Sequence, residues 1–157
     1  MTYVGETGEI TGVIRPNGID TLQMRESVAV SFLATGALTD GEFGLFRWNM
    51  TPDAGGPGAH FHRTFSESFY VLSGTVTVYD GKAWVDGNPG DFFYVPKGGI
   101  HGFRNDSGKD ASMLILFAPA PPREKFFTEL AEIHRSARLL SPDEWADFYA
   151  RHDQVNL

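Results

Sequence analysis

The sequence contains no cysteine, which excludes disulfide bridges and metal sites built from thiolates. This composition fits a reducing compartment. Long apolar runs are missing as well, because no stretch approaches the roughly 20 apolar residues that a membrane-spanning helix needs. The first residues, MTYVGETGEITG, lack the basic and apolar parts of a secretory signal. We therefore expect a cytoplasmic protein with no membrane partner.

Basic residues are scarce relative to acidic ones. The chain has 13 Lys and Arg residues against 20 Asp and Glu residues, and its formal net charge is −7. Nucleic acids and anionic membranes are bound through basic surfaces. The charge balance therefore argues against a nucleic acid as a partner.

The composition that is present indicates one globular domain rich in short strands. A chain of 157 residues is long enough to bury a stable core without disulfide bridges or a structural metal ion. Hydrophobic residues make up 41% of it, and 18 glycines and nine prolines provide many turns.

The chain divides into three regions, and the first two differ in composition. Residues 1–26 are mostly polar, with a turn signal at RPNGID, and predict an N-terminal arm or short strand. Residues 27–118 contain short segments of β-branched and aromatic residues, most of them bounded by turn residues. The pair Asp80-Gly81 predicts a two-residue type I′ hairpin, in which both central residues have positive φ. Many short strands with regular turns predict an all-β sandwich or barrel.

The third region, residues 119–157, changes to a helical period. Ser141, Pro142 and Glu144 form a capping-box start for the second of two predicted helices. The two helices could cover the outside of the β domain, mediate a dimer, or form a lid. Their predicted apolar stripes are Phe126, Leu130, Ile133 and Ala137 in the first and Trp145, Phe148 and Tyr149 in the second.

The stretch GPGAHFHRTFSESFYVLSG, residues 56–74, brings two histidines and a glutamate close together. On a strand, His60 and His62 point to the same face, and a turn or bulge would let Glu67 face the same point. His101 is the candidate for a fourth ligand, and imidazoles with a carboxylate suit a divalent first-row metal. A strand histidine is more often packed or at the surface, and spacing alone does not bring His101 back to the pair. Both interpretations stay open on the spacing.

Two motifs resemble the signatures of the cupin superfamily. The first reads Gly, five residues, His-x-His, three or four residues, Glu, six residues, Gly; the second reads Gly, five residues, Pro-x-Gly, two residues, His, three residues, Asn. One departure is that four residues, rather than five, separate Gly55 from His60. The matching residues are His60, His62, Glu67 and Gly74 in the first motif and Gly90, Pro96, Gly98, His101 and Asn105 in the second.

This resemblance runs from about residue 27 to the C-terminal helices and is similar to small bacterial monocupins of the quercetin 2,3-dioxygenase-like kind. It implies a jelly-roll β-barrel with two C-terminal helices and a divalent metal ion inside. The ion would be Fe, Mn, Ni, Co, Cu or Zn. The implied ligands are His60, His62, Glu67 and His101, with Glu67 also a candidate general base.

The resemblance also implies a function. It favours a homodimeric metal-dependent dioxygenase acting on a small molecule with an enol, phenol or carboxylate group. A non-redox cupin isomerase, lyase or cyclase, or a cupin that binds a small molecule without turnover, are the alternatives.

Strand parity predicts which residues lie near the metal. Phe69 and Val71 share parity with Glu67, and Phe103 shares it with His101. In FRWNM either Phe46, Trp48 and Met50 face inward, or Arg47 and Asn49 do. The second arrangement would place an arginine where it could clamp a substrate carboxylate. The predicted substrate pocket follows the first arrangement and consists of Phe69, Val71, Phe103, Trp48 and Met50.

Overall fold

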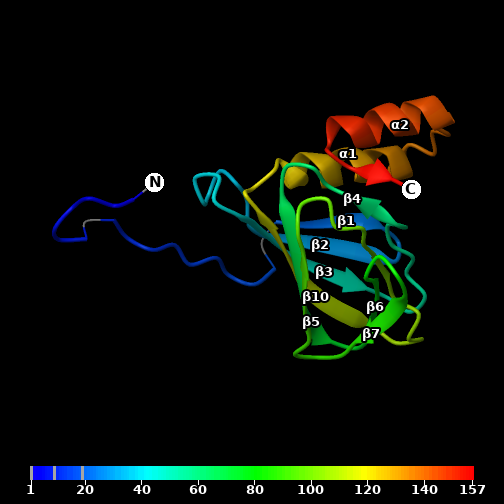
Figure 1. Cartoon of the computed structure of the whole chain (residues 1–157), viewed down its shortest axis with the longest axis horizontal. Coiled ribbons are helices and arrows are strands. Elements are labelled where there is room, and N and C mark those ends of the chain that lie inside the picture. Colours follow the sequence, from blue (N-terminus) through cyan, green and yellow to red (C-terminus); the bar gives the residue numbers. More distant parts are fainter. Residues whose placement is uncertain (1, 9, 19) are drawn as a thin grey trace.

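The computed structural model describes residues 2–8, 10–18 and 20–157 (Figure 1). Most of the regular structure consists of short strands, with two helices near the C-terminus. In chain order these elements are β1 (Thr21–Arg25), β2 (Val28–Ala34), β3 (Gly44–Met50), β4 (His60–Phe61), β5 (Ser66–Ser73), β6 (Val76–Tyr79), β7 (Trp84–Gly87), β8 (Phe92–Val95), β9 (Gly102–Arg104), β10 (Ala111–Ala118), α1 (Arg123–Arg135), α2 (Pro142–Arg151) and β11 (Val155–Asn156).

The strands form an antiparallel barrel. A six-stranded sheet has the order β1-β2-β3-β10-β5-β8, a three-stranded sheet has the order β7-β6-β9, and β11 pairs with β4. The non-consecutive neighbours, such as β3 beside β10, are crossovers typical of a jelly roll. The all-β jelly-roll fold with two C-terminal helices is thus confirmed. Strand β1 belongs to the large sheet, so the sheet begins at Thr21, before the predicted barrel start at residue 27.

Alternation along β3 decides between the two arrangements of FRWNM. Phe46, Trp48 and Met50 are buried in the core. Arg47 is on the opposite face, where its Nε donates to the Ser112 hydroxyl at 3.2 Å. The apolar residues therefore face inward, and Arg47 does not reach the interior of the barrel.

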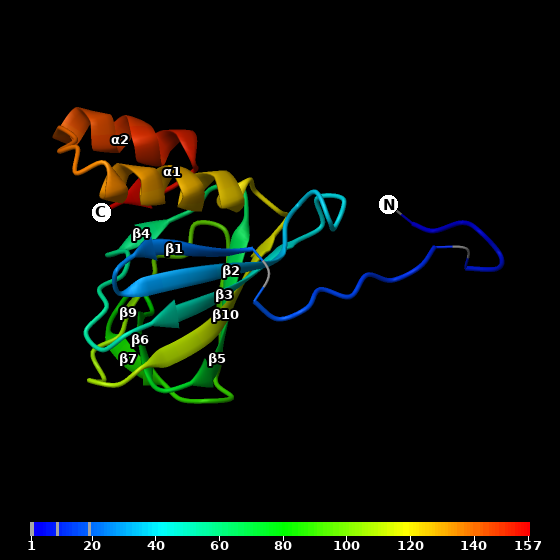
Figure 2. The ribbon, with the colours of Figure 1, turned by 180° about the vertical axis from the view of Figure 1, so that it is seen from behind.

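Helix α1 packs into the barrel through Phe127, which the predicted stripe missed. The Phe127 ring lies 5.2 Å from that of Phe46 and 5.4 Å from that of Trp48. Ala137 lies beyond the end of α1, with φ 52°, so it does not extend the stripe. The helix thereby closes one side of the core, and Figures 1 and 2 show both helices lying together beside β1 and β4.

Helix α2 begins with the predicted capping box. The Ser141 hydroxyl accepts from the Glu144 N–H at 3.2 Å, and the Glu144 carboxylate accepts from the Ser141 N–H at 2.8 Å. After α2 the chain turns at Asp153 and runs back as β11 along β4. No helix among the described residues is long and apolar enough to cross a membrane.

The predicted hairpin at Asp80-Gly81 has a longer loop than expected. Tyr79 pairs with Trp84, so four residues connect β6 to β7. Of the two central residues, Gly81 alone has positive φ. The Asp80 carboxylate accepts from the N–H groups of Lys82 and Ala83, and this side-chain turn replaces the two-residue type I′ turn.

Candidate metal centre

Four predicted ligands meet inside the barrel. His60 begins β4, His62 follows it, and Glu67 is on β5. His101 joins them through an antiparallel bridge to His60. All four side chains are buried, and one ligand atom from each lies within 4.8 Å of the others.

Backbone carbonyl groups orient the three imidazoles. Each Nδ1 lies within hydrogen-bond distance of a carbonyl oxygen, which can only accept, so each Nδ1 carries the proton. Each Nε2 is therefore left to face the centre, the arrangement that metal-ligating histidines adopt. The three pairs are His60 with Gly58 at 2.8 Å, His101 with Gly99 at 2.9 Å and His62 with Asp153 at 2.5 Å.

Glu67 provides the negative charge of the site. Its Oε2 lies 2.8 Å from His101 Nε2 and 3.2 Å from His62 Nε2. Burial opposes ionisation of Glu67, but the charge and hydrogen bond of His101, with those of His62, outweigh it and hold the pKa of this carboxyl well below its usual range. Burial and the neighbouring His101 lower the pKa of His60 to about 3, which keeps this imidazole neutral.

The donor set fits a divalent transition metal. An ion held about 2.1 Å from each ligand places opposite ligands about 4.2 Å apart, and the four candidate atoms lie within 4.8 Å of one another. Three imidazoles, which ligate through a deprotonated Nε2, and one carboxylate are ligands that first-row metals accept. Four protein ligands also leave a position open on a five- or six-coordinate ion, as a catalytic site requires.

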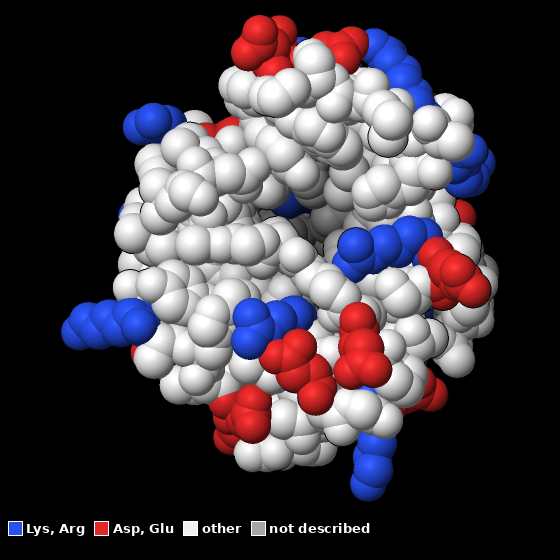
Figure 3. All heavy atoms as spheres, turned by 90° about the vertical axis from the view of Figure 1, so that its right-hand side faces the viewer, with Lys and Arg blue, Asp and Glu red and all other residues white. Residues whose placement is uncertain are grey.

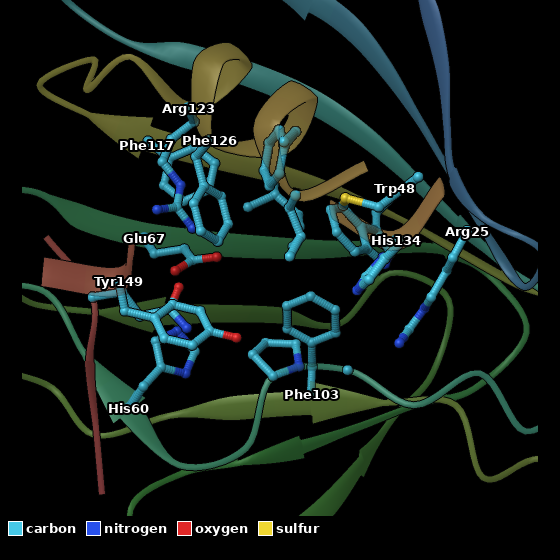
Figure 4. Close-up of a pocket in the computed structure, with 17 residues that line it drawn as sticks. Arg25, Trp48, His60, Glu67, Phe103, Phe117, Arg123, Phe126, His134 and Tyr149 are labelled. Atoms are coloured by element: carbon cyan, nitrogen blue, oxygen red, sulfur yellow. The ribbon is translucent and has the colours of Figure 1, made fainter. Parts of the chain in front are cut away.

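A cavity of about 140 Å³ opens beside these ligands (Figure 4). His60 and Glu67 line one end of it, and Trp48 and Phe103 are part of its apolar wall. The other predicted pocket residues, Phe69, Val71 and Met50, are buried in the core but lie outside this lining. Strand parity predicted that these three side chains face the interior, and they do, but parity does not distinguish the wall of the cavity from the packed core.

Two further residues belong to the site and were not singled out in the sequence. Arg123, the first residue of α1, is buried and lines the cavity. Asp153 orients His62 through its carbonyl group. In the sequence, REKFF belongs to the predicted helical region, and no role was assigned to Arg123 or Asp153. Their roles come from long-range packing that no local pattern encodes.

Residues 46–117 match the family model described as "Cupin domain". A segment of 48 residues is 40% identical to quercetin 2,3-dioxygenase of Bacillus subtilis (strain 168). It covers 31% of this chain and only 14% of that enzyme, so this chain spans a small part of the curated relative it matches.

Solved structures share the fold at low sequence identity. KdgF from Halomonas sp. superposes with a TM-score of 0.59 at 19% identity, over 67% of this chain and 92% of that chain. The polyketide cyclase RemF from Streptomyces resistomycificus superposes with a TM-score of 0.59 at 19% identity, over 72% of this chain and 82% of that chain. A sugar phosphate isomerase of the cupin superfamily from Silicibacter pomeroyi superposes with a TM-score of 0.54 at 22% identity, over 62% of this chain and 63% of that chain. The domain match supports the cupin resemblance, and these structural similarities confirm the fold.

Proposed function

Starting from a small cupin with this buried ligand set, we propose that the chain is a metal-dependent enzyme, and specifically a dioxygenase, acting on a small molecule with an enol, phenol or carboxylate group. One observation carries the proposal: four buried ligand atoms lie within 4.8 Å of one another at the end of a cavity. The similarity of one segment to quercetin 2,3-dioxygenase supports the oxygenase class.

The size of the cavity favours a substrate smaller than a flavonol. Its volume of about 140 Å³ is close to that of an engineered cavity of roughly 150 Å³ that binds benzene. A flavonol has three rings, whereas this space accommodates about one. We therefore place single-ring enols and phenols, and acids of similar size, ahead of flavonols as substrates.

Glu67 is the candidate general base. Its Oε2 is engaged by His62 and His101, whereas its Oε1 has no hydrogen-bond partner among the described residues. Because Glu67 lines the cavity, Oε1 is the atom that would accept a proton from a substrate hydroxyl. Trp48 and Phe103 would hold the ring of the substrate and exclude water from this step.

The metal would be held by His60, His62, Glu67 and His101. When bound, it would act as a Lewis acid that lowers the pKa of a substrate oxygen and fixes its orientation. The ligand set accommodates Fe, Mn, Ni, Co, Cu or Zn. The role of Glu67 as a ligand weakens it as a base, so its two roles oppose each other.

The alternative is a non-redox isomerase, lyase or cyclase that uses the same ion as a Lewis acid. It gains support from the structural similarity to an isomerase and to a cyclase. Both classes require the metal and an open position, and they differ in whether dioxygen is consumed.

Metal content tests the proposal first. We expect close to one transition-metal ion per chain when the protein is purified without added metal or chelator and measured by mass spectrometry. His62→Ala should lose most of it. His134→Ala is the matched control, because His134 lines the cavity but lies outside the ligand set. No metal in the wild type, or equal content in wild type and His62→Ala, would refute the metal centre.

An oxygen electrode then separates the two enzyme classes. Single-ring enols and phenols are screened with wild type and His62→Ala. Oxygen uptake that disappears in the variant supports the dioxygenase. Product formation without oxygen uptake supports the non-redox alternative instead.

A further inference from the structure

Arg123 is a buried cation at the metal end of the cavity. Its side chain is 5% exposed, and it comes from the first residue of α1. Figure 4 shows Arg123, Glu67, His60 and Tyr149 around one end of the cavity, with Arg25, Trp48 and His134 toward the other. Burial lowers the pKa of Arg123 to about 10, so it stays protonated at neutral pH.

The direct contacts of Arg123 with the described residues leave its guanidinium without an ion pair. The charges of Glu67 and Asp153 act on it from a distance and raise its pKa, but by less than burial lowers it. Among the described residues no carboxylate forms an ion pair with it. The hydrogen bond found for its guanidinium is a long one, 3.4 Å from Nη1 to the His152 carbonyl, and its buried Nε has no partner in the described part of the chain. The guanidinium is otherwise surrounded by aromatic rings, with the Phe126 centroid 3.9 Å away.

The helix makes this position less favourable still. The N-terminus of a helix carries a partial positive charge and favours anions, so a cation in the first turn is opposed by the backbone. A buried charge is usually paired or hydrogen-bonded. Arg123 therefore offers a positive charge and an unused Nε–H to an anion that enters the cavity.

The rest of the cavity also favours an anion. Arg25 and Arg123 both line it, whereas Glu67 is the one carboxylate that the described residues contribute to its lining. This is a local excess of positive charge in a chain whose net charge is −7. Trp48 leaves a second buried donor, its indole Nε1, without a partner. Figure 3 shows a hollow whose rim is largely uncharged, with atoms of a basic residue visible at its depth.

We propose that Arg123 binds the carboxylate of the substrate, so that the substrate class is a small organic acid of about one ring. The planar guanidinium donates to carboxylate oxygens, while the aromatic wall accommodates the remainder of the molecule. Arg123 is thus the specificity-determining residue of the site. This inference rests on the proposed enzymatic function, which supplies the substrate, although binding to Arg123 can be measured without turnover.

The test uses benzoate, with benzamide as its uncharged analogue of the same shape. Both are titrated by calorimetry into zinc-loaded wild type, Arg123→Met and Arg123→Lys. We expect wild type to bind benzoate at least tenfold more tightly than benzamide, and Arg123→Met to lose at least tenfold in benzoate affinity. Arg123→Lys keeps the charge without the planar fork and should fall between them. Equal benzoate affinity in wild type and Arg123→Met, or no preference over benzamide in wild type, overturns the proposal.

Metal content and folding are measured on the same samples. Arg123→Met should bind as much zinc as wild type, because Arg123 is not in the ligand set. A chain that binds no metal but shows Arg123-dependent benzoate binding would refute the proposed enzyme and leave this inference standing. If Arg123→Met does not fold, the Arg123 Nε–H resonance of ¹⁵N-labelled wild type, assigned by its absence in Arg123→Lys, provides the readout. It should shift on addition of benzoate, and an unmoved resonance overturns the proposal.

Discussion

His60 and His101 exchange both of their backbone hydrogen bonds, each N–H donating to the carbonyl group of the other residue at 2.9 Å. This bridge joins the two cupin motifs, which β6 and β7 separate along the chain. It also fixes the distance between two candidate metal ligands before any side chain is considered. Close backbone approach around this bridge should therefore control metal affinity.

Gly56 tests that dependence. A Cβ at Gly56 would lie 1.9 Å from the Phe103 carbonyl oxygen, whereas a Cβ at Gly58 would meet nothing within 4 Å. Gly56→Ala must push apart the segments that carry His60 and His101, so we expect zinc affinity to fall at least tenfold. Gly58→Ala is the matched control and should leave it within twofold. Competition with a chromophoric chelator measures both, and equal affinities would show that the bridge tolerates separation.

The sequence predicted the ligands more readily than their surroundings. The alternation of His60 and His62 is local and predicts that both face the same side of a strand, whereas Glu67 joins them only if a turn or bulge precedes it. Bringing His101 to the pair required the cupin resemblance, since a contact between distant segments has no periodic signature. Arg123 was out of reach for a stronger reason. An arginine at the start of a helix normally lies in water, and only the packing of α1 into the barrel buries it.

Asp153 should control the orientation of His62. Its carboxylate accepts from the Arg63 and Thr64 N–H groups at 3.0 and 2.8 Å, and its carbonyl accepts from His62 Nδ1 at 2.5 Å. Asp153→Ala frees the end of β4 and loosens the carbonyl, so we expect metal affinity to fall about 10- to 100-fold, as when such supporting contacts are lost. Asp147→Ala, on an exposed position of α2, should have no effect. The same chelator competition applies, and unchanged affinity in Asp153→Ala would assign the segment to stability alone.

Metal removal should lower the unfolding temperature. An ion that binds the folded chain and not the unfolded one stabilises it by about 2.7 kcal/mol when present at 100 times its dissociation constant. We expect a chelator to lower the midpoint of thermal unfolding of wild type by several degrees. His62→Ala should unfold at the same temperature with and without chelator. A chelator effect of equal size in both proteins would place the stabilising ion elsewhere.

The expected homodimer remains a prediction, and the N-terminal segment is its most direct test. Val4, Ile10, Val13 and Ile14 are at least 67% exposed, and Figures 1 and 2 show this segment extending away from the barrel. Burying four such side chains against a second copy would be favourable. We expect light scattering to give a dimer for the full chain and a monomer after deletion of residues 1–18. A full-length monomer would contradict the prediction, and a dimer that survives the deletion would move the interface to the barrel.

Phe127 connects the stability of the fold to the shape of the cavity. Its ring packs on Phe46 and Trp48 in the core and also lines the cavity. Phe127→Ala should lower the free energy of unfolding by about 3–5 kcal/mol, the usual cost of removing a buried phenyl group. Phe92→Ala is the control, because Phe92 is 63% exposed, and it should cost well under half as much. Denaturant titration measures both.

The same substitution enlarges the space available to a ligand. If the cavity wall at Phe127 limits the substrate to about one ring, Phe127→Ala should raise the affinity for 1-naphthoate relative to benzoate, because a second ring then fills the vacated volume. Phe127→Leu removes less volume and should change this ratio less. A ratio that stays constant across the three proteins would mean that the acid lies away from α1. Arg123 is on the same helix, so that result would contradict the carboxylate site as well.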